Sequence, residues 1–371
     1  LTTLSEMGLL PTRNFQRGVF EAAEQIGGVR LHDTILVDRE TCAGCPIRCK
    51  RAVRTVFDGH EILPEYGGPE YETLAAFGSL CMNSDLASIA WANQLCNDYG
   101  LDTISAGVVI AFAMEASERG MIDETISWGD PRAIVQMVRD LAHREGLAAA
   151  AADGLSRWAE RLGADFSMCI KGVEIPMHEP RGKQGMGLSY ATTPRGANHM
   201  EGLHDTMLSS DAPCPELGID HAYDRSSLEG KVLPVKTFEE LRSFDNALVL
   251  CCFTARAVGD RYNYPALRTL VEAATGLSVD AEEMLRIGER GIAAMRLLSG
   301  QQGHTKEQDS LPDRFATALP AGPSDRPVDP AALRTAIDAL YQARGYDRFG
   351  PTDATLRALQ MEDCIGKLTR D

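Results

Sequence analysis

The chain has 371 residues, of which 44% are apolar and 24% charged, so it is long enough for about two or three soluble globular domains. Its 37 Lys and Arg against 53 Asp and Glu give a formal net charge of −16, which argues against nucleic acid and anionic membranes as partners. Ten cysteines are too dilute for a disulfide-rich secreted protein, and the most apolar run, residues 107–114, is too short to span a membrane. We expect a cytoplasmic protein.

Two local structures are predicted in the first sixty residues. Apolar residues at helical spacing predict a helix over residues 14–25, which Gly27 and Gly28 close. Farther on, Val53, Thr55 and Phe57 alternate before Asp58-Gly59. This alternation followed by a turn pair is the pattern of a short β-hairpin.

A cysteine-rich segment lies between these two structures. Cys42, Cys45 and Cys49 form a C-x2-C-x3-C array, in which Gly44 and Pro46 keep the backbone out of a regular helix. Three thiolates from one loop and a distant fourth cysteine commonly hold an iron–sulfur cluster, whereas structural zinc more often uses two Cys pairs or a Cys pair and a His pair. The array favours a 4Fe-4S cluster, while zinc and unliganded cysteines stay open.

Residues 64–73 combine glycines and prolines with three carboxylates, Glu65, Glu70 and Glu72. One interpretation is a solvated acidic loop before a helix, because the helix dipole favours Glu there. The other is a general acid or base that faces a pocket.

A helical hairpin is predicted next. Asp85 and Asp102 are each placed to cap a helix, and the first helix ends at Gly100. The connecting turn, Asn97 to Asp102, presents carbonyls, amides and polar side chains in one small volume. It is therefore either a capped turn and nothing more, or a site that grips a polar heterocycle.

This turn has a weak counterpart later in the chain. Asn97 and Leu101 recur as Asn246 and Leu250 at equal spacing, and the pair Cys251-Cys252 follows. That pair supplies a fourth cluster thiolate, although neighbouring side chains diverge and only one of the two is expected to be a ligand. Two equivalent turns would approach one cofactor from two sides.

The segment 171–202 is rich in glycine and contains His178 and His199. We expect an ordered loop that lines the main cavity, because a linker would not hold so many apolar residues. Helical patterns fill most of the remaining chain, over residues 131–146, 146–162, 264–274, 280–298 and 330–344. The fold class is therefore predicted to be all-α, in two mainly helical domains, 1–170 and 171–371.

Five segments, in chain order, carry a family resemblance: CAGCPIRCKR, GGPEYETLAAFGSLC, LCNDYGLDTISAGVVIAFAMEASERG, GVEIPMHEPRGKQGMGLSYATTPRGANHM and LCCF. They resemble the C-terminal two thirds of the tungsten-containing aldehyde ferredoxin oxidoreductases, over almost the whole chain. The resemblance implies a 4Fe-4S cluster and a tungsten (or molybdenum) bis-molybdopterin at the interface of the two domains. The cluster ligands would be Cys42, Cys45, Cys49 and Cys251.

The resemblance also assigns the two turns to the pterins. Residues matching the family's pterin-binding positions are Asn97, Gly100, Leu101, Asp102, Asn246 and Leu250. The chain departs from the family pattern because Asn replaces the leading Asp in both turns and Val249 replaces the second Gly. An Asn still hydrogen-bonds a pterin ring but loses the charge-assisted bond of a carboxylate.

The implied activity is oxidation of a small aldehyde to its carboxylic acid, with electrons leaving through the cluster to ferredoxin or another carrier. Glu70 or Glu72 would take the proton, and His199 would hydrogen-bond the reacting carbonyl. The sequence does not decide which glutamate acts, or whether the metal is tungsten or molybdenum. It leaves open the identity of the substrate and whether the protein forms a homodimer. It also leaves open a tungsten–pterin reductase of an acyl or aromatic thioester, and a non-catalytic helical protein with an iron–sulfur or zinc site.

The family's N-terminal β-rich domain, which supplies a saddle for the pterins, has no counterpart before Leu1. We therefore expect either a fragment of a longer protein or a separate subunit that carries this domain.

Overall fold

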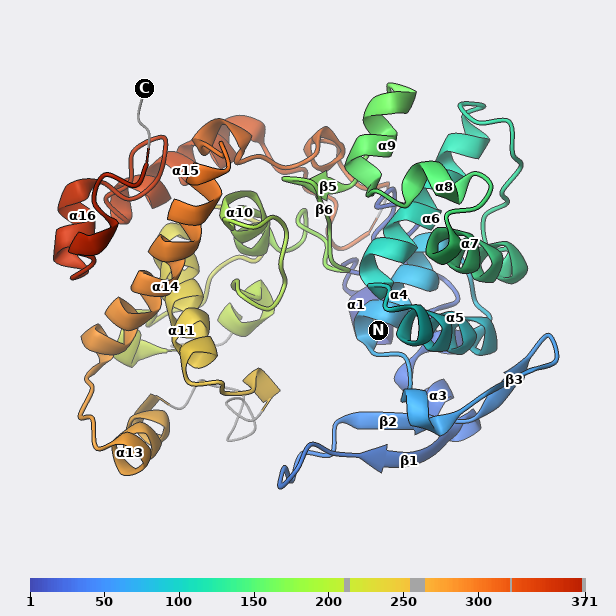
Figure 1. Ribbon diagram of the computed structural model, residues 1–371, viewed down its shortest axis with the longest axis horizontal. Coiled ribbons are helices and arrows are strands. Elements are labelled where there is room, and N and C mark those ends of the chain that lie inside the picture. The colour runs from blue at the N-terminus through green and yellow to red at the C-terminus, as the bar shows by residue number, and fades with distance from the viewer. Residues whose placement is uncertain (210–213, 254–263, 321, 369–371) are drawn as a thin grey trace. The chain divides into compact units, whose positions relative to one another are not determined.

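The computed structural model describes residues 1–209, 214–253, 264–320 and 322–368 (Figure 1). The chain divides into two compact units. Unit 1 comprises Leu1–Gly182 and Pro312–Pro327, and unit 2 comprises Lys183–Leu311 and Val328–Asp371. Both units are mainly helical, and the strands within the described ranges form three small antiparallel pairs. The predicted all-α class is confirmed.

Among the described residues, unit 1 contains all six assigned strands and the first nine α-helices in chain order. Its helices are α1 (Thr2–Glu6), α2 (Ala23–Ile26), α3 (Gly28–Thr34), α4 (Tyr71–Phe77), α5 (Leu86–Tyr99), α6 (Thr103–Glu118), α7 (Pro131–His143), α8 (Ala148–Ala151) and α9 (Leu155–Leu162). Its strands are β1 (Leu36–Glu40), β2 (Lys50–Val53), β3 (Thr55–Phe57), β4 (His60–Ile62), β5 (Cys169–Ile170) and β6 (Val173–Glu174).

Helices α5 and α6 follow one another across the turn at Gly100, and the two caps predicted for them are confirmed, although α5 packs chiefly against α7 and α6 against α4. The Asp85 carboxylate accepts from the amide of Ser88 at 2.6 Å, and the Asp102 carboxylate accepts from the amide of Ser105 at 2.8 Å. Residues 106–116 of α6 are all buried, so the apolar run noted in the sequence is a core helix. The hairpin predicted at Asp58-Gly59 is confirmed as β3 and β4.

The helix predicted over residues 14–25 is wrong, since only its end is helical, in α2. Arg13, Asn14 and Phe15 adopt left-handed backbone conformations, with φ of 50°, 49° and 61°. The amide of Arg13 donates to the carbonyl of Ser79 at 3.1 Å instead of forming a helical bond. The apolar spacing that suggested a helix comes from a compact turn whose Phe15 side chain is fully buried.

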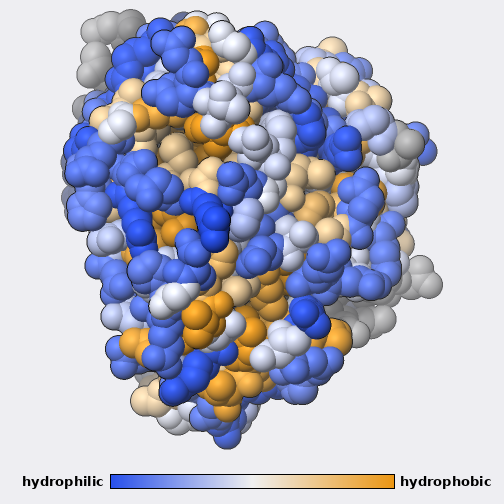
Figure 2. Space-filling model, turned by 90° about the vertical axis from the view of Figure 1, so that its right-hand side faces the viewer, coloured by the Kyte–Doolittle hydropathy of each residue, from blue (hydrophilic) through white to orange (hydrophobic). Residues whose placement is uncertain are grey.

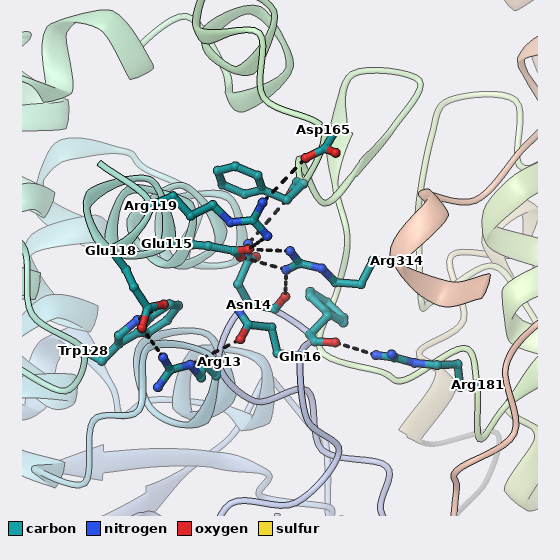
Figure 3. Close-up of polar contacts among 12 residues, drawn as sticks. Arg13, Asn14, Gln16, Glu115, Glu118, Arg119, Trp128, Asp165, Arg181 and Arg314 are labelled. Carbon is teal, nitrogen blue, oxygen red and sulfur yellow. Dashed lines mark hydrogen bonds and ion pairs between the residues drawn. The ribbon is translucent and has the colours of Figure 1, made fainter. Parts of the chain in front are cut away.

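A buried carboxylate ties three separate parts of unit 1 together (Figure 3). Glu115 on α6 is 1% exposed and accepts from both ends of the Arg314 guanidinium, at 2.6 and 2.8 Å. The side-chain amide of Asn14 donates to it at 2.7 Å, and Arg119 donates from the next helical turn at 2.5 Å. Arg314 belongs to the segment 312–327, so this network joins that segment to the N-terminal part of the unit.

Unit 2 is built on crossing helices. Its elements are α10 (Gln184–Thr192), α11 (Val232–Ala247), α13 (Tyr264–Thr275), α14 (Ala281–Gln301), α15 (Pro330–Ala343) and α16 (Asp353–Ala358). The helices α11 and α14 approach closely at Gly288, where an added Cβ would lie 1.9 Å from the carbonyl oxygen of Glu240. The prediction of a loop over residues 171–202 is partly wrong, because helix α10 lies within this range.

The start of α10 explains why a glycine-rich stretch is helical there. The fully buried carboxylate of Asp205 accepts from the amides of Gly185 and Met186, at 3.0 and 2.8 Å, and it is paired with the buried ammonium of Lys231. A carboxylate at a helix N-terminus satisfies amides that have no partner within the helix.

The surface agrees with the charge-rich composition. Hydrophilic residues cover much of the face shown in Figure 2, with apolar residues between them. Within the ranges that the structure describes, no helix combines the length and apolar character needed to cross a membrane.

Candidate functional site

The three clustered cysteines lie in the loop that closes a β-hairpin of unit 1. Strands β1 and β2 pair antiparallel and end with Glu40 opposite Lys50, so residues 41–49 form the loop. Cys42 is exposed, Cys45 and Cys49 are half-buried, and all three are free thiols. The amide of Cys45 donates to the carbonyl of Cys42 at 3.0 Å, which makes a tight turn between the first two cysteines.

The donor chemistry of this loop fits a thiolate-bound iron–sulfur cluster, because three free thiols share one short loop. The backbone turns sharply at Gly44 and Arg48, which have φ of 71° and 51°. In the described residues, however, no three His, Cys, Asp or Glu side chains are grouped closely enough to hold a metal ion.

The predicted fourth ligand belongs to unit 2. Cys251 is exposed and Cys252 is half-buried, directly after the turn that ends α11. Thus the four predicted ligands are divided between the units: Cys42, Cys45 and Cys49 in unit 1, and Cys251 in unit 2.

The first predicted pterin turn is the C-terminal cap of α5. Gly100 has φ of 70°, and the amide of Leu101 donates to the carbonyl of Cys96 at 2.9 Å. This is the hydrogen-bond pattern of a Schellman cap. Asn97 is exposed, and its side-chain amide donates to the carbonyl of Asn93 at 2.9 Å. Asp102 is also exposed, while its carboxylate caps α6.

The second predicted turn repeats this cap at the end of α11. The amide of Leu250 donates to the carbonyl of Asp245 at 2.9 Å, five residues back as in the first turn. Val249 occupies the position of Gly100, with φ of 56°, and is 92% exposed. A β-branched residue rarely adopts this conformation. The hydrogen bond and the positive φ nevertheless match those of the first turn, so the weak sequence similarity at Asn246 corresponds to a repeated backbone geometry.

The two candidate glutamates lie in different surroundings. Glu70 is the N-cap residue of α4, and its side chain is 59% exposed and lies 3.4 Å from Arg51. Burial raises the pKa of Glu70 and the charge of Arg51 opposes this. Glu72, in the first turn of α4, is 14% exposed and lies 3.3 Å from Nε2 of His178.

His178 is the partner of Glu72 that sequence reasoning did not assign. Tyr71 stacks on the His178 ring at a centroid distance of 5.3 Å, and its hydroxyl donates to the carbonyl of Met177. The amide of Met177 donates to the other carboxylate oxygen of Glu72 at 2.7 Å. Burial, with the neighbouring charge of Glu72, raises the pKa of Tyr71 well above its usual value, so the phenol remains a donor.

The segment that carries His178 is fixed on its other side as well. Glu179 and Arg181 are fully or almost fully buried and form a two-pronged ion pair at 2.7 and 2.9 Å. Arg181 also donates to the carbonyl of Phe15. The sequence contains a local signal for this arrangement, since His178 directly precedes Glu179-Pro180-Arg181.

His199 belongs to unit 2, in the turns that follow α10. It is half-buried, and its carbonyl oxygen accepts a hydrogen bond from Nε2 of His204 at 2.8 Å. The candidate acid–base residues are thus divided in the same way as the cluster ligands, with Glu70 and Glu72 in unit 1 and His199 in unit 2.

Comparison with known proteins covers nearly the whole chain. The family model described as aldehyde ferredoxin oxidoreductase, domains 2 and 3, matches residues 1–361. The chain is 35% identical over 362 residues to the tungsten-containing aldehyde ferredoxin oxidoreductase of Thermococcus kodakarensis, covering 94% of this chain and 56% of that protein. It is 24% identical over 386 residues to an aliphatic sulfonate oxidoreductase, WOR-like subunit, of Pyrococcus furiosus, covering 97% and 56% of the two chains.

A solved structure has a similar fold. The active-site complex BamBC of benzoyl coenzyme A reductase in complex with 1,5-dienoyl-CoA matches with a TM-score of 0.72 at 17% identity, over 97% of this chain and 58% of that one. At this identity the likeness supports the helical fold alone.

These matches identify the chain as a pair of helical domains from a family of oxidoreductases. The chain belongs to the aldehyde ferredoxin oxidoreductase family, and it corresponds to that family's domains 2 and 3. It spans 56–59% of the length of the curated tungsten-containing relatives that it matches.

Proposed function

We propose that the whole protein to which this chain belongs oxidises small aldehydes to carboxylic acids at a tungsten or molybdenum bis-molybdopterin, and that electrons pass through a 4Fe-4S cluster to ferredoxin or another carrier. Membership of the aldehyde ferredoxin oxidoreductase family supports the reaction class. The greater length of the relatives supports a further N-terminal domain, on the same or a separate chain.

Both cofactors have residues of suitable chemistry on this chain. The thiols of Cys42, Cys45, Cys49 and Cys251 would hold the cluster. The exposed caps at Asn97–Asp102 and Asn246–Leu250 would hydrogen-bond the pterins, whose metal, when bound, supplies the two-electron oxidation. The repeated cap geometry supports this assignment, because two matched turns present amide and carbonyl groups in the same way.

The observation that carries the assignment of the proton acceptor is the pair of Glu72 and His178. A carboxylate that is 14% exposed and 3.3 Å from an imidazole has little competition from bulk water, and the imidazole provides a second place for a proton. Glu70 is open to solvent and paired with Arg51, so its proton exchanges with water. We therefore assign the proton acceptor to Glu72, and His199 to hydrogen bonding of the substrate carbonyl.

Glutamine substitutions of the two glutamates test this assignment. In the full-length protein, purified without oxygen, Glu72→Gln should lower kcat for aldehyde oxidation by about 10²–10⁴-fold. Its tungsten and iron contents should equal those of the wild type. Glu70→Gln, a matched change two residues away, should lower kcat by less than about threefold. Equal losses in both variants would contradict the choice of Glu72.

Metal analysis tests the cofactors separately from the glutamates. Wild-type protein should contain about four iron atoms per chain and one tungsten or molybdenum, as the cluster and the bis-pterin require. Cys45→Ser should lose most of the iron, whereas Cys364→Ser, which changes a half-buried cysteine of unit 2, should keep it. Zinc in place of iron in the wild type would overturn the proposed function.

A further inference from the structure

Unit 2 contains a small cavity of about 20 Å³ between α11, α14 and the turns that follow α10. Its lining residues are Thr193, Pro194, Glu201, Glu239, Ser243, Asn246, Ile292 and Met295. A cavity of at least about 10–15 Å³ accommodates a water molecule if polar groups surround it. This cavity is thus large enough for a water molecule and has a mixed polar and apolar lining.

One face of α11 supplies the polar stripe of this cavity. Glu239, Ser243 and Asn246 are spaced four and three residues apart, which places them on the same side of the helix. The Glu239 side chain is 12% exposed, whereas Asn246 is exposed, directly before the second capped turn. The stripe therefore leads from a buried carboxyl group to the turn assigned to the pterin.

Only one of the two carboxylate oxygens of Glu239 accepts a hydrogen bond of ordinary geometry from the described residues. Its Oε2 atom lies 2.7 Å from Nη2 of the buried Arg344, which donates to it. Its Oε1 atom is buried and makes no hydrogen bond of ordinary geometry with the residues that the structure describes, although the hydroxyl of Ser189 lies near this carboxyl group. A buried carboxylate oxygen without a donor is costly, so a water molecule in the cavity is favoured. Ser243 lines the same cavity and is a second polar residue beside such a water.

The surroundings keep this carboxyl group near its point of half-protonation at neutral pH. Burial raises the pKa of Glu239 to about 7, against the opposing charge of Arg344 and the nearby hydroxyl of Ser189. The charged and titratable groups of the surrounding elements are Arg344, Glu240, Lys236, Glu289, Glu201 and Tyr346. Glu239 therefore binds and releases a proton without a large change in pH.

We propose that Glu239 and water in this cavity form a proton relay, which carries a proton away from the turn at Asn246. The inference rests on the proposed function. In each turnover an aldehyde and water yield a carboxylic acid, two protons and two electrons: the aldehyde C–H bond and a water O–H bond break, and a C–O bond forms. The electron carrier takes the electrons one at a time. Glu72, the acceptor assigned above, takes one of the two protons; Glu239 takes the other from cavity water and passes it to bulk water.

Infrared spectroscopy tests the proton-binding half of this proposal without any turnover. In wild-type full-length protein, the carbonyl band of protonated carboxylic acids should contain a component that titrates near pH 7. Glu239→Gln should remove that component, and Glu239→Asp should keep a titrating group. The Gln variant is expected to fold, because its amide oxygen still accepts from Arg344. An unchanged titration in the Gln variant would overturn the proposal.

Enzyme kinetics tests the transfer. With metal contents equal to the wild type, Glu239→Gln should lower kcat for aldehyde oxidation about tenfold, leave KM unchanged and increase the solvent deuterium isotope effect. Glu239→Asp should recover part of the rate. Glu240→Gln is the matched control, because this buried neighbour faces Lys236 and does not line the cavity. Its isotope effect should equal that of the wild type.

The outcomes separate this inference from the proposed function. A wild-type protein that contains its cofactors and does not oxidise aldehydes overturns the proposed function, and the relay with it. An active wild type in which Glu239→Gln has normal kinetics overturns the relay alone. Equal isotope effects in the Glu239→Gln and Glu240→Gln variants would reduce Glu239 to a structural role and also overturn the relay.

Discussion

Replacing Glu115 by Gln tests whether one buried carboxylate holds unit 1 together. The change keeps the shape of the side chain and removes its charge. Arg314, which is 13% exposed, would then keep a buried charge without its anionic partner, and Arg119 would lose one of its two acidic partners. Breaking a buried ion pair by removing one partner costs about 3–5 kcal/mol.

We expect a loss of about 3 kcal/mol for Glu115→Gln, at the lower end of the range for such pairs, because the Gln oxygen still accepts from Asn14. Such a loss is about a hundredfold in the folding equilibrium constant. The chain has three tryptophans, Trp91, Trp128 and Trp158, and all lie in unit 1. Tryptophan fluorescence during guanidinium unfolding therefore reports on this unit.

Glu118→Gln is the matched control, three residues along the same helix. The Glu118 side chain is 46% exposed and pairs with Arg13 at the surface. Exposed ion pairs contribute about 0–1 kcal/mol, so this variant should shift the unfolding midpoint little. Equal shifts of the midpoint in the Glu115 and Glu118 variants would refute the reasoning.

The same network predicts a pH dependence. Burial acts to raise the pKa of Glu115, but Arg314, Asn14 and Arg119 outweigh it and lower the pKa below its ordinary value of 4.5. A carboxyl group whose pKa is lowered in the folded state stabilises fully above its unfolded pKa, and this contribution is lost as the pH falls through the folded pKa. The stability difference between wild type and Glu115→Gln should therefore be constant above about pH 5 and narrow below pH 4.5.

Two further predictions concern unit 2. Gly288→Ala should lower its stability by about 1–3 kcal/mol, measured by circular dichroism during unfolding, because the new methyl group would meet the backbone of Glu240. The control is Gly28→Ala in helix α3 of unit 1, where a methyl group meets nothing within 4 Å. It should not destabilise the protein, and an equal loss in both variants would contradict this account. Asp205→Asn removes the partner of buried Lys231 and should speed amide hydrogen exchange in the first turn of α10; unchanged exchange would show that the pair does not hold the helix start.

Features set by neighbours in the sequence were predictable. The caps at Asp85 and Asp102 and the turn at Asp58-Gly59 depend on residues within a few positions, so composition and spacing are sufficient. The exception is the helix predicted over residues 14–25. There the backbone follows hydrogen bonds to a distant segment around Ser79, which the local pattern does not contain.

The candidate site was predictable as a set of residues but not as a set of partners. The sequence contained Glu70 and Glu72 as equal alternatives, and only the contact of Glu72 with His178, over a hundred positions away, distinguishes them. Likewise, Glu239 had no motif around it. Its environment depends on Arg344, the residue that follows the end of α15, and no local pattern connects these two residues.

The segment 312–327 has a consequence for the order in which the protein is made. Unit 1 is not finished when the ribosome reaches Gly182, because Arg314 must still meet Glu115, 199 residues earlier. Closing so large a loop is slow compared with local helix formation. Unit 1 therefore cannot complete its folding until most of unit 2 has been synthesised. Until then Glu115 lacks its partner Arg314. Truncating the chain at Gly182 should consequently yield an aggregation-prone product, and adding residues 312–327 as a second chain should rescue it.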